Sequence, residues 1–150
     1  LIADLLAHPE KIEEVPEPNI PEINTPLYDC WDKMAKRLIN QLWKASQAQI
    51  FHNPVDPDRL GIEDYFDIVK DPIDFGTIKQ RLIHNRYDSM DQVVKDIERC
   101  FENCLLYNGE DSPAGQSCMK VKSEYAKLKL QFNIDFYLHV FKPTLTDFKQ

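Results

Sequence analysis

The side chain best suited to hydrogen-bond recognition is Asn108, which occurs in the sequence Tyr107-Asn108-Gly109. Its amide offers two N–H donors and one carbonyl acceptor, and it stands at the predicted end of an amphipathic helix. An Asn-Gly pair at a helix end is also the usual signature of a left-handed C-cap, which is a structural role. The residues alone therefore support two interpretations of Asn108, a ligand-binding amide or a helix terminator.

The other side chains with obvious chemistry are the four cysteines, Cys30, Cys100, Cys104 and Cys118. None forms a C-x-x-C pair and no H-x-x-x-H motif accompanies them, so we predict no metal site, and we expect no cofactor. Cys100 and Cys104 would share one helix face, which is typical of reduced, buried thiols in an intracellular protein. An enzyme that pairs Cys100 or Cys104 with a histidine is an alternative, and rapid labelling of one thiol at neutral pH would support it.

Composition and charge indicate one soluble globular domain. The 150 residues are 43% hydrophobic and 29% charged, and no run approaches the roughly 18 apolar residues of a membrane span. The sequence shows no concentrated cluster of basic residues, which nucleic-acid binding needs. Its net charge of −7 favours basic peptides as partners instead. Residues 53–75 carry seven carboxylates against two basic side chains, either as a solvated loop or as an attractive surface. The absence of a starting Met suggests a piece of a longer protein.

The first 25 residues are predicted to stand apart from the helical part of the chain. Four prolines between residues 15 and 26 exclude a helix there and favour an extended, polyproline-like backbone. Before them lies a short apolar stripe, which we expect to pack on the helices or on a neighbouring domain. The stripe consists of Leu1, Ile2, Leu5 and Leu6.

The first main helix is predicted to begin with Thr25 as N-cap and Pro26 as its first residue, and to run for about 24 residues. Apolar residues then lose their helical spacing between residues 49 and 73, where prolines and a glycine predict a long connection. That connection has room for one helical turn around residues 64–69. A loop of this length inside a compact domain is usually functional. The apolar stripe of the helix is Leu27, Trp31, Met34, Leu38 and Leu42.

Three further amphipathic helices follow the long connection. Asp74 is predicted to cap a helix that reaches about His84, and Ser89 with Gln92 forms a capping box for the helix that ends at Asn108. Ser112-Pro113 starts the last helix, and the tail beyond Pro143 is expected to fray. The stripe of the third helix is Met90, Val94, Ile97, Phe101 and Cys104, and that of the fourth is Ala114, Cys118, Val121, Tyr125, Leu128 and Phe132.

Four such helices predict an all-α, up-down four-helix bundle with a long loop between its first two main helices. The long loop and the turn at residues 108–112 both follow a helix that runs in the same direction. They must therefore meet at one end of the bundle, where binding sites of bundles commonly lie.

Four motifs in this order resemble the bromodomain family, and the resemblance covers roughly residues 26–136. They are FHNPVD at 51–56, DYF at 64–66, KDPIDFGTI at 70–78 and NCLLYN at 103–108. Members of this family are left-handed four-helix bundles that recognise acetylated lysine in other proteins. The resemblance implies a bundle over 26–141, a lead-in over 1–25 and a tail over 142–150.

The resemblance also implies specific roles for residues at the loop end of the bundle. Asn108 would donate a side-chain N–H to the acetyl carbonyl, Tyr65 would reach the same oxygen through an ordered water, and Phe51 would pack beneath the acetyl methyl. The rest of the acetyl-lysine site would be formed by Val55, Leu60, Ile62, Tyr107, Ile50, Cys104 and Ala114.

Two positions depart from the family pattern. The family usually has Trp-Pro-Phe where this chain has Gln49-Ile50-Phe51, so the shelf beside the pocket lacks two of its three usual members. Six residues after the pocket asparagine the family often has a bulky gatekeeper, and this chain has Ala114. These differences concern pocket width and flanking-sequence preference rather than acetyl recognition.

The resemblance implies a non-catalytic reader of acetylated lysine, in histone tails or other proteins, that recruits a nuclear chromatin or transcription regulator. We expect an isolated monomer that binds acetylated peptides at micromolar to millimolar concentration, and neither nucleic acid nor membrane directly. The alternative is a helical scaffold with a degenerate pocket, whose interaction surface is the N-terminal apolar stripe.

Overall fold

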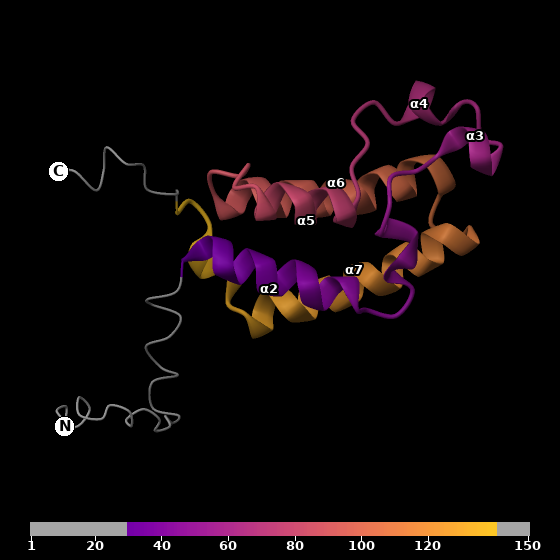
Figure 1. The fold of residues 1–150 in the computed structure, drawn as a ribbon. Helices are drawn as coiled ribbons and strands as arrows, with labels where there is room; N and C mark the ends of the chain where they lie inside the picture. Colours follow the sequence, from indigo (N-terminus) through magenta and orange to yellow (C-terminus); the bar gives the residue numbers. More distant parts are fainter. Residues whose placement is uncertain (1–29, 141–150) are drawn as a thin grey trace, which may run out of the picture. The chain divides into compact units, whose positions relative to one another are not determined.

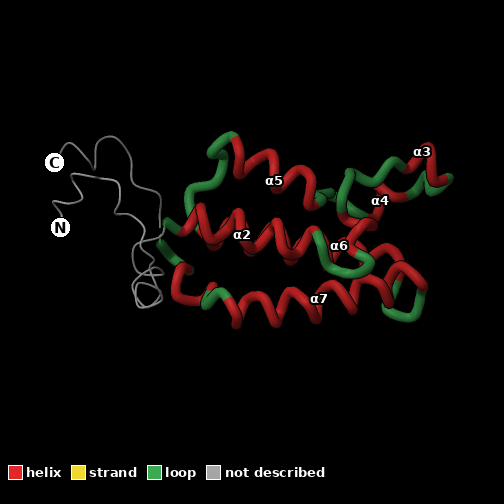
Figure 2. The backbone as a smooth tube through the Cα atoms, turned by 60° about the horizontal axis from the view of Figure 1, so that its bottom comes forward, coloured by secondary structure: helices red, strands yellow, loops and turns green. Residues whose placement is uncertain are grey.

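The computed structural model describes residues 30–140, and all regular structure in this range is helical. Four main helices form a bundle in which α2 packs against α5 and α7, and α6 also packs against α5 and α7 (Figures 1 and 2). The predicted all-α four-helix bundle is therefore confirmed. The main helices are α2 Trp31–Trp43, α5 Phe75–Ile83, α6 Met90–Asn108 and α7 Pro113–Gln131, and the short ones are η2 Ala48–Phe51, α3 Pro57–Leu60, α4 Tyr65–Ile68 and η3 Ile134–Tyr137.

Several predictions fall on residues outside this range. They include the N-terminal apolar stripe, the proline-rich lead-in, the Thr25 cap and the tail beyond Pro143. Between residues 30 and 140, no helix is long and apolar enough to cross a membrane. Over the same residues, no group of three or more His, Cys, Asp or Glu side chains is placed to hold a metal ion.

The predicted apolar stripes form the core of the bundle. Trp31, Leu38 and Leu42 of α2 are buried, as are Ile97 of α6 and Val121 of α7. Full burial of such a side chain contributes roughly 1.5–3 kcal/mol, so tertiary packing rather than local propensity stabilises these helices. Within the last two stripes, Cys104, Ala114 and Phe132 are only half-buried.

The predicted C-terminal end of the first helix is wrong. Within the described residues α2 spans Trp31–Trp43, whereas the spacing predicted a helix that continues to about Gln49. The early end has a tertiary cause. His52 stacks on Trp43 with ring centroids 3.7 Å apart, and its Nε2 lies 3.0 Å from the Trp43 carbonyl oxygen. That contact satisfies a carbonyl at the helix end, and Gln47 then turns the chain with a φ of 70°.

The other predicted caps are confirmed, with one change of partner. The side chains of Asp74 and Ser112 accept hydrogen bonds from backbone N–H groups three residues later, at 2.9 Å each. Ser89 likewise accepts from the Gln92 N–H at 3.4 Å. Gln92 does not complete the predicted capping box, because its Oε1 accepts from the N–H of Asp88, one residue before the cap, at 2.7 Å.

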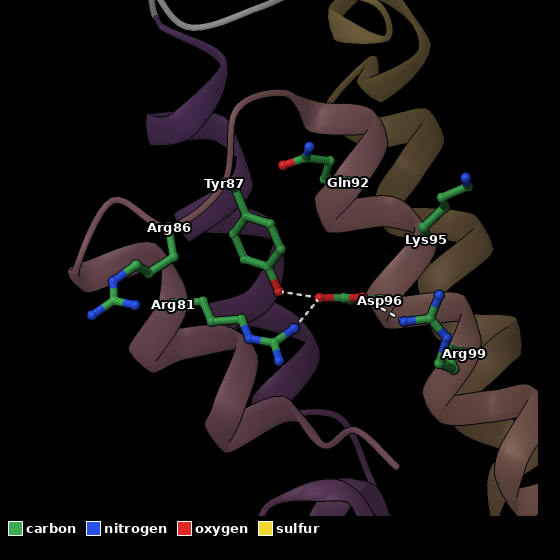
Figure 3. Close-up of a pocket in the computed structure, with 7 residues that line it drawn as sticks. All are labelled: Arg81, Arg86, Tyr87, Gln92, Lys95, Asp96 and Arg99. Atoms are coloured by element: carbon green, nitrogen blue, oxygen red, sulfur yellow. Dashed lines mark hydrogen bonds and ion pairs between the residues drawn. The ribbon is translucent and has the colours of Figure 1, made fainter. Parts of the chain in front are cut away.

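A buried carboxylate joins α5 to α6 (Figure 3). Asp96 is 7% exposed, and its Oδ2 accepts hydrogen bonds from Arg81 Nη1 at 2.7 Å and from the Tyr87 hydroxyl at 2.6 Å. Its Oδ1 accepts from Arg99 Nη1 at 2.9 Å. Three donors, one each from α5, the α5–α6 connection and α6, therefore compensate the cost of burying this charge.

Tyr87 gives the bundle a defined sensitivity to alkali. Burial, followed by the hydrogen bond to Asp96, raises the pKa of Tyr87 above its usual value of 10.0. Above pH 10 the unfolded chain therefore loses this proton before the folded one, so stability falls as pH rises. We expect Tyr87→Phe to cost about 1 kcal/mol at neutral pH and to flatten the alkaline decline. Urea unfolding across a pH series measures both effects, and parallel curves for the two proteins would contradict the linkage.

Candidate functional site

A cavity of about 350 Å³ is lined by residues of η2, α3, α4, α6 and α7. The short helices α3 and α4 lie at the end of the bundle where α6 turns into α7 (Figure 1). All ten residues that the sequence placed in a binding site line the cavity, together with nine others. The predicted residues are Ile50, Phe51, Val55, Leu60, Ile62, Tyr65, Cys104, Tyr107, Asn108 and Ala114; the others are Gln49, Asn53, Pro54, Asp56, Arg59, Ile73, Asp74, Cys100 and Asn103.

Phe51 lines this cavity with a nearly buried aromatic ring. It is 5% exposed, and its ring contacts Phe75 and Phe101 with centroids 5.0 Å and 5.4 Å apart. These tilted and edge-on contacts hold the ring at one angle. The Trp43–His52 stack, which the sequence did not predict, fixes the chain directly after Phe51, and Lys79 Nζ lies 4.2 Å from the Trp43 ring.

Asn108 ends α6 with its amide at the cavity. Its Nδ2 donates to the Cys104 carbonyl at 3.0 Å, and Cys104 Sγ lies 3.7 Å from the same nitrogen. The left-handed C-cap interpretation is wrong, because Asn108 is itself helical and Gly109 has φ 81° with ψ 156°. This ψ lies far from the left-handed helical region, in backbone space that favours glycine.

The turn after Asn108 is fixed by a close approach between two glycines. The Ser112 hydroxyl donates to the Gly109 carbonyl at 2.8 Å and accepts from the Gly115 N–H at 2.9 Å. A Cβ atom on Gly115 would lie 1.8 Å from the Gly109 carbonyl oxygen. Only glycine therefore lets the first turn of α7 approach the end of α6 this closely.

Two hydrogen bonds attach the long loop to α6 beside the cavity, from residues one helical turn apart. The Tyr107 hydroxyl donates to Asp64 Oδ1 at 2.6 Å, and Asn103 Nδ2 donates to the Asp71 carbonyl at 2.9 Å. The bond to Asp64 raises the pKa of Tyr107 and keeps its hydroxyl protonated. The sequence motifs contained Asp64 and Asn103, but nothing in their spacing indicated these contacts.

Tyr65 supplies a second polar group to the same space. It is 6% exposed, and its ring lies 5.1 Å from that of Tyr107. Burial raises the pKa of Tyr65, so its hydroxyl remains a hydrogen-bond donor at neutral pH. The apolar residues of the lining differ in solvent exposure. Val55 and Ile62 are half-buried, whereas Leu60 is 52% exposed.

Cys104 brings a thiol to the cavity wall. A hydrogen bond with the Cys118 thiol, opposed by burial and assisted by Asn108, lowers the pKa of Cys104. Burial raises the pKa of Cys100, and the bond with Cys104 raises that of Cys118. Across residues 30–140, the lining of this cavity contains no histidine that could serve as the base of a cysteine enzyme.

Thiol alkylation provides a map of this cavity. We expect iodoacetamide to modify Cys104 faster than Cys100 or Cys118, because Cys104 is only half-buried, whereas the other two are buried, and has the lower pKa. A saturating ligand in the cavity should slow modification of Cys104 alone. Cys30, which is exposed, serves as the internal control in peptide mass spectrometry. Equal protection of Cys30 and Cys104, or none of Cys104, would contradict the assignment.

The chain matches known proteins at the level of sequence. The family model described as Bromodomain matches residues 35–120. An ankyrin repeat, bromo and BTB domain-containing protein of Dictyostelium discoideum is 38% identical over 96 residues, which are 64% of this chain and 12% of that protein. The SWR1 complex bromodomain subunit bdf1 of Schizosaccharomyces pombe is 36% identical over 101 residues, which are 67% of this chain and 18% of that protein. The chain thus spans less than a fifth of either relative.

A solved structure agrees with the sequence matches. The second bromodomain of Candida albicans Bdf1, solved with a bound imidazopyridine, superimposes with a TM-score of 0.62 at 30% identity. The superposition covers 65% of this chain and 94% of that one. That structure is a left-handed four-helix bundle, as predicted for this chain. Sequence match and fold agree, and the chain belongs to the bromodomain family.

Proposed function

We propose that this domain binds acetylated lysine in other proteins through the cavity that Phe51 lines. Bromodomains are generally non-catalytic acetyl-lysine readers of chromatin proteins, which supports the proposal at the level of the family. The observation that carries it here is the convergence of Asn108, Tyr65 and Phe51 on one cavity of about 350 Å³. An amide donor, a phenolic donor and an apolar ring match the carbonyl and methyl of an acetamide.

The Asn108 amide can serve the ligand without losing its place in the fold. One N–H satisfies the Cys104 carbonyl at 3.0 Å, while the contact with Cys104 Sγ is long at 3.7 Å. The second N–H is therefore available to the acetyl carbonyl. Tyr65 would reach that oxygen through a bridging water, which costs little relative to a direct hydrogen bond.

Selection against unmodified lysine follows from charge. An ammonium group carries only donors, so it cannot accept a hydrogen bond from Asn108. Its burial against the Phe51 ring without a paired carboxylate would cost several kcal/mol. Two carboxylates line the cavity. Asp74 already accepts from the N–H and hydroxyl of Thr77, at 2.9 Å and 2.7 Å, and Asp56 is exposed and accepts from the Arg59 N–H as the cap of α3. Acetylation removes the charge and adds both an acceptor and a methyl group.

The loop around the cavity favours a basic peptide as the carrier of the acetyl-lysine. Four exposed carboxylates lie in the long loop that contributes residues to the cavity lining. They are Asp56, Asp58, Glu63 and Asp67. Such a rim raises the association rate of positively charged segments, including histone tails. The relative named as a SWR1 complex subunit supports a nuclear, chromatin-associated role for the parent protein. We propose that the bundle over residues 26–141 acts there as a monomeric, non-catalytic recruitment module.

An array of peptides in acetylated and unmodified forms tests the proposal, with calorimetry on the best binders. We expect micromolar to millimolar dissociation constants for acetylated peptides and at least about tenfold weaker binding of their unmodified forms. Binding that ignores acetylation, or no binding to any acetylated peptide, would favour the scaffold alternative. Thiol protection of Cys104 by the same peptides ties the binding to the cavity.

Ala114 predicts tolerance of longer acyl groups. Ala114 lines the cavity from the first turn of α7, which begins at Pro113 as the sequence predicted, and Pro113 itself does not line it. Each added methylene that becomes buried contributes about 0.8 kcal/mol, so propionyl- and butyryl-lysine should bind with little loss. Ala114→Ile should weaken butyryl-lysine binding roughly tenfold more than acetyl-lysine binding. Calorimetry with three acyl forms of one peptide measures this, and unchanged acyl preference would remove Ala114 from the pocket.

A further inference from the structure

A second cavity, of about 380 Å³, lies between α5 and α6 and shares no lining residue with the first (Figure 3). Along α6 the two linings are adjacent in sequence, because Arg99 lines this cavity and Cys100 lines the first. Arg99 stands nine positions before Asn108, which corresponds to about 13 Å of helix. We call this cavity the cationic groove. It is lined by Arg81, Arg86, Tyr87, Gln92, Lys95, Asp96 and Arg99.

The charge of the cationic groove is opposite to that of the whole chain. Four cationic side chains and one carboxylate line it, an excess of three positive charges, whereas the chain carries −7. The flanking carboxylates Asp88 and Asp91 do not line it. Positive charge is thus concentrated in one concave site, where the surrounding low-dielectric walls strengthen its field.

The hydrogen bonds to Asp96 orient Arg81 and Arg99 but use only some of their N–H donors. Each guanidinium has five N–H donors, and Asp96 takes a hydrogen bond from Nη1 of Arg81 and from Nη1 of Arg99. Arg99 also lies 3.5 Å from an Asp71 oxygen through its Nε. The remaining N–H groups are held in a fixed orientation, which reduces the entropy lost when a ligand binds.

Arg81 and Arg99 have a structural role, because they bind the buried Asp96 carboxylate. Arg86 and Lys95 have no such role. Arg86 and Lys95 are exposed, and within residues 30–140 neither has a carboxylate at ion-pair distance. Figure 3 shows them on opposite sides of Tyr87, one on the α5–α6 connection and the other on α6. Two uncompensated cations beside two oriented arginines are a feature that helix packing does not require.

We propose that the cationic groove binds a phosphomonoester, as a phosphorylated serine or threonine of a partner protein. A phosphate dianion accepts bidentate hydrogen bonds from guanidinium groups and offsets the positive excess. Clusters of arginine are a recurrent means of recognising phosphorylated segments. A long nucleic acid fits less well, because it would extend beyond the groove along a surface of net negative charge.

Nuclear magnetic resonance titration of the full 150-residue chain with O-phospho-L-serine at low salt provides the first test. We expect amide shifts at Arg86, Tyr87, Lys95 and Arg99, and no comparable shifts with serine or with equal ionic strength of sodium chloride. Peptides with a central phosphoserine should bind more tightly than the free amino acid. Absence of these shifts at millimolar phosphoserine would overturn the proposal.

Charge reversal provides the second test. The double variant Arg86→Glu/Lys95→Glu should weaken phosphopeptide binding at least about tenfold, since each charge-assisted hydrogen bond lost accounts for such a factor. Both positions are exposed, and a thermal melt checks that the fold is kept. The matched control Lys120→Glu/Lys127→Glu makes the same charge change on the exposed face of α7. If the control weakens phosphopeptide binding equally, the effect arises from net charge alone, and the assignment of the site is overturned.

Two further measurements separate this proposal from its rivals. A DNA duplex that binds more tightly than the phosphopeptides, with the same dependence on Arg86 and Lys95, would overturn the phosphomonoester assignment in favour of nucleic acid. Asn108→Ala should leave phosphopeptide binding unchanged, so failure of the acetyl-lysine proposal would not affect the result. Loss of phosphopeptide binding in Asn108→Ala would place the ligand in the first cavity and contradict a separate groove.

Discussion

Replacement of Asn108 by alanine should weaken the binding of acetylated peptides about 5- to 150-fold, below detection for the weakest of them, while leaving the bundle folded. The side chain is exposed, and in the free protein it donates to the carbonyl of Cys104 on its own helix. Its loss should therefore change the free energy of unfolding by less than about 1 kcal/mol. The bound acetyl carbonyl would in contrast lose its direct donor inside an apolar cavity, which costs about 1–3 kcal/mol. That loss corresponds to about 5- to 150-fold weaker binding, which takes a ligand of near-millimolar affinity out of the calorimetric range.

Two companion variants make this experiment decisive. Asn108→Asp keeps the shape of the side chain but replaces the donor with a carboxylate, so it should also weaken binding. Asn103→Ala removes a similar amide from the same helix, but one that anchors the Asp71 carbonyl, so it should lower stability and weaken binding only partly. A stable Asn108→Ala protein that binds acetylated peptides normally would end the assignment of Asn108 as the acetyl anchor.

Replacement of Asp96 by alanine should strongly destabilise the fold. It leaves the buried Tyr87 hydroxyl without its acceptor and breaks the cross-helix bond from Arg81. The two arginines are partly exposed, at 45% and 32%, and can regain water, so the cost arises mainly from the hydroxyl and the lost helix–helix contacts. We expect a loss of about 2–3 kcal/mol in the free energy of unfolding by urea.

Glu102 supplies the control for this second prediction. It is an exposed carboxylate on α6, six residues after Asp96, and Glu102→Ala should change stability by less than about 0.5 kcal/mol. Any Asp96→Ala protein that remains folded should still bind acetylated peptides, because Asp96 does not line the first cavity. Equal stability of the two variants would show that the arginine–tyrosine network contributes nothing to the fold.

The sequence predicts those parts of the fold that depend on neighbouring residues. Asp74, Ser89 and Ser112 each cap a helix through an N–H three residues away, so a short window contains both partners. The end of α2 depends on the ring of His52, nine residues beyond Trp43, and the spacing of apolar residues does not indicate this contact. Helix α3 was missed although its signals are local, since Asp56 caps it and Pro57 begins it.

The site divides in the same way. The lining residues followed from motifs whose order matches a known family, and the cavity contains all of them. The bonds that shape the cavity join residues 43 and 32 positions apart, Tyr107 to Asp64 and Asn103 to Asp71, and one sequence gives no means of pairing them. The sequence did not predict the cationic groove. The net charge of the chain is negative, and the local excess of positive charge arises only when α5 and α6 pack side by side.

The contact between Gly115 and Gly109 limits how this domain can change over evolutionary time. Gly115 lies outside the lining of the binding cavity, yet its lack of a side chain sets where α6 ends and therefore where the Asn108 amide stands. Any larger residue at 115 must push the two helix ends apart, and the amide moves with them. A lineage could keep every lining residue and still lose its ligand through this one position. Comparisons of related domains that score only ligand-contacting residues would therefore count such inactive members as functional.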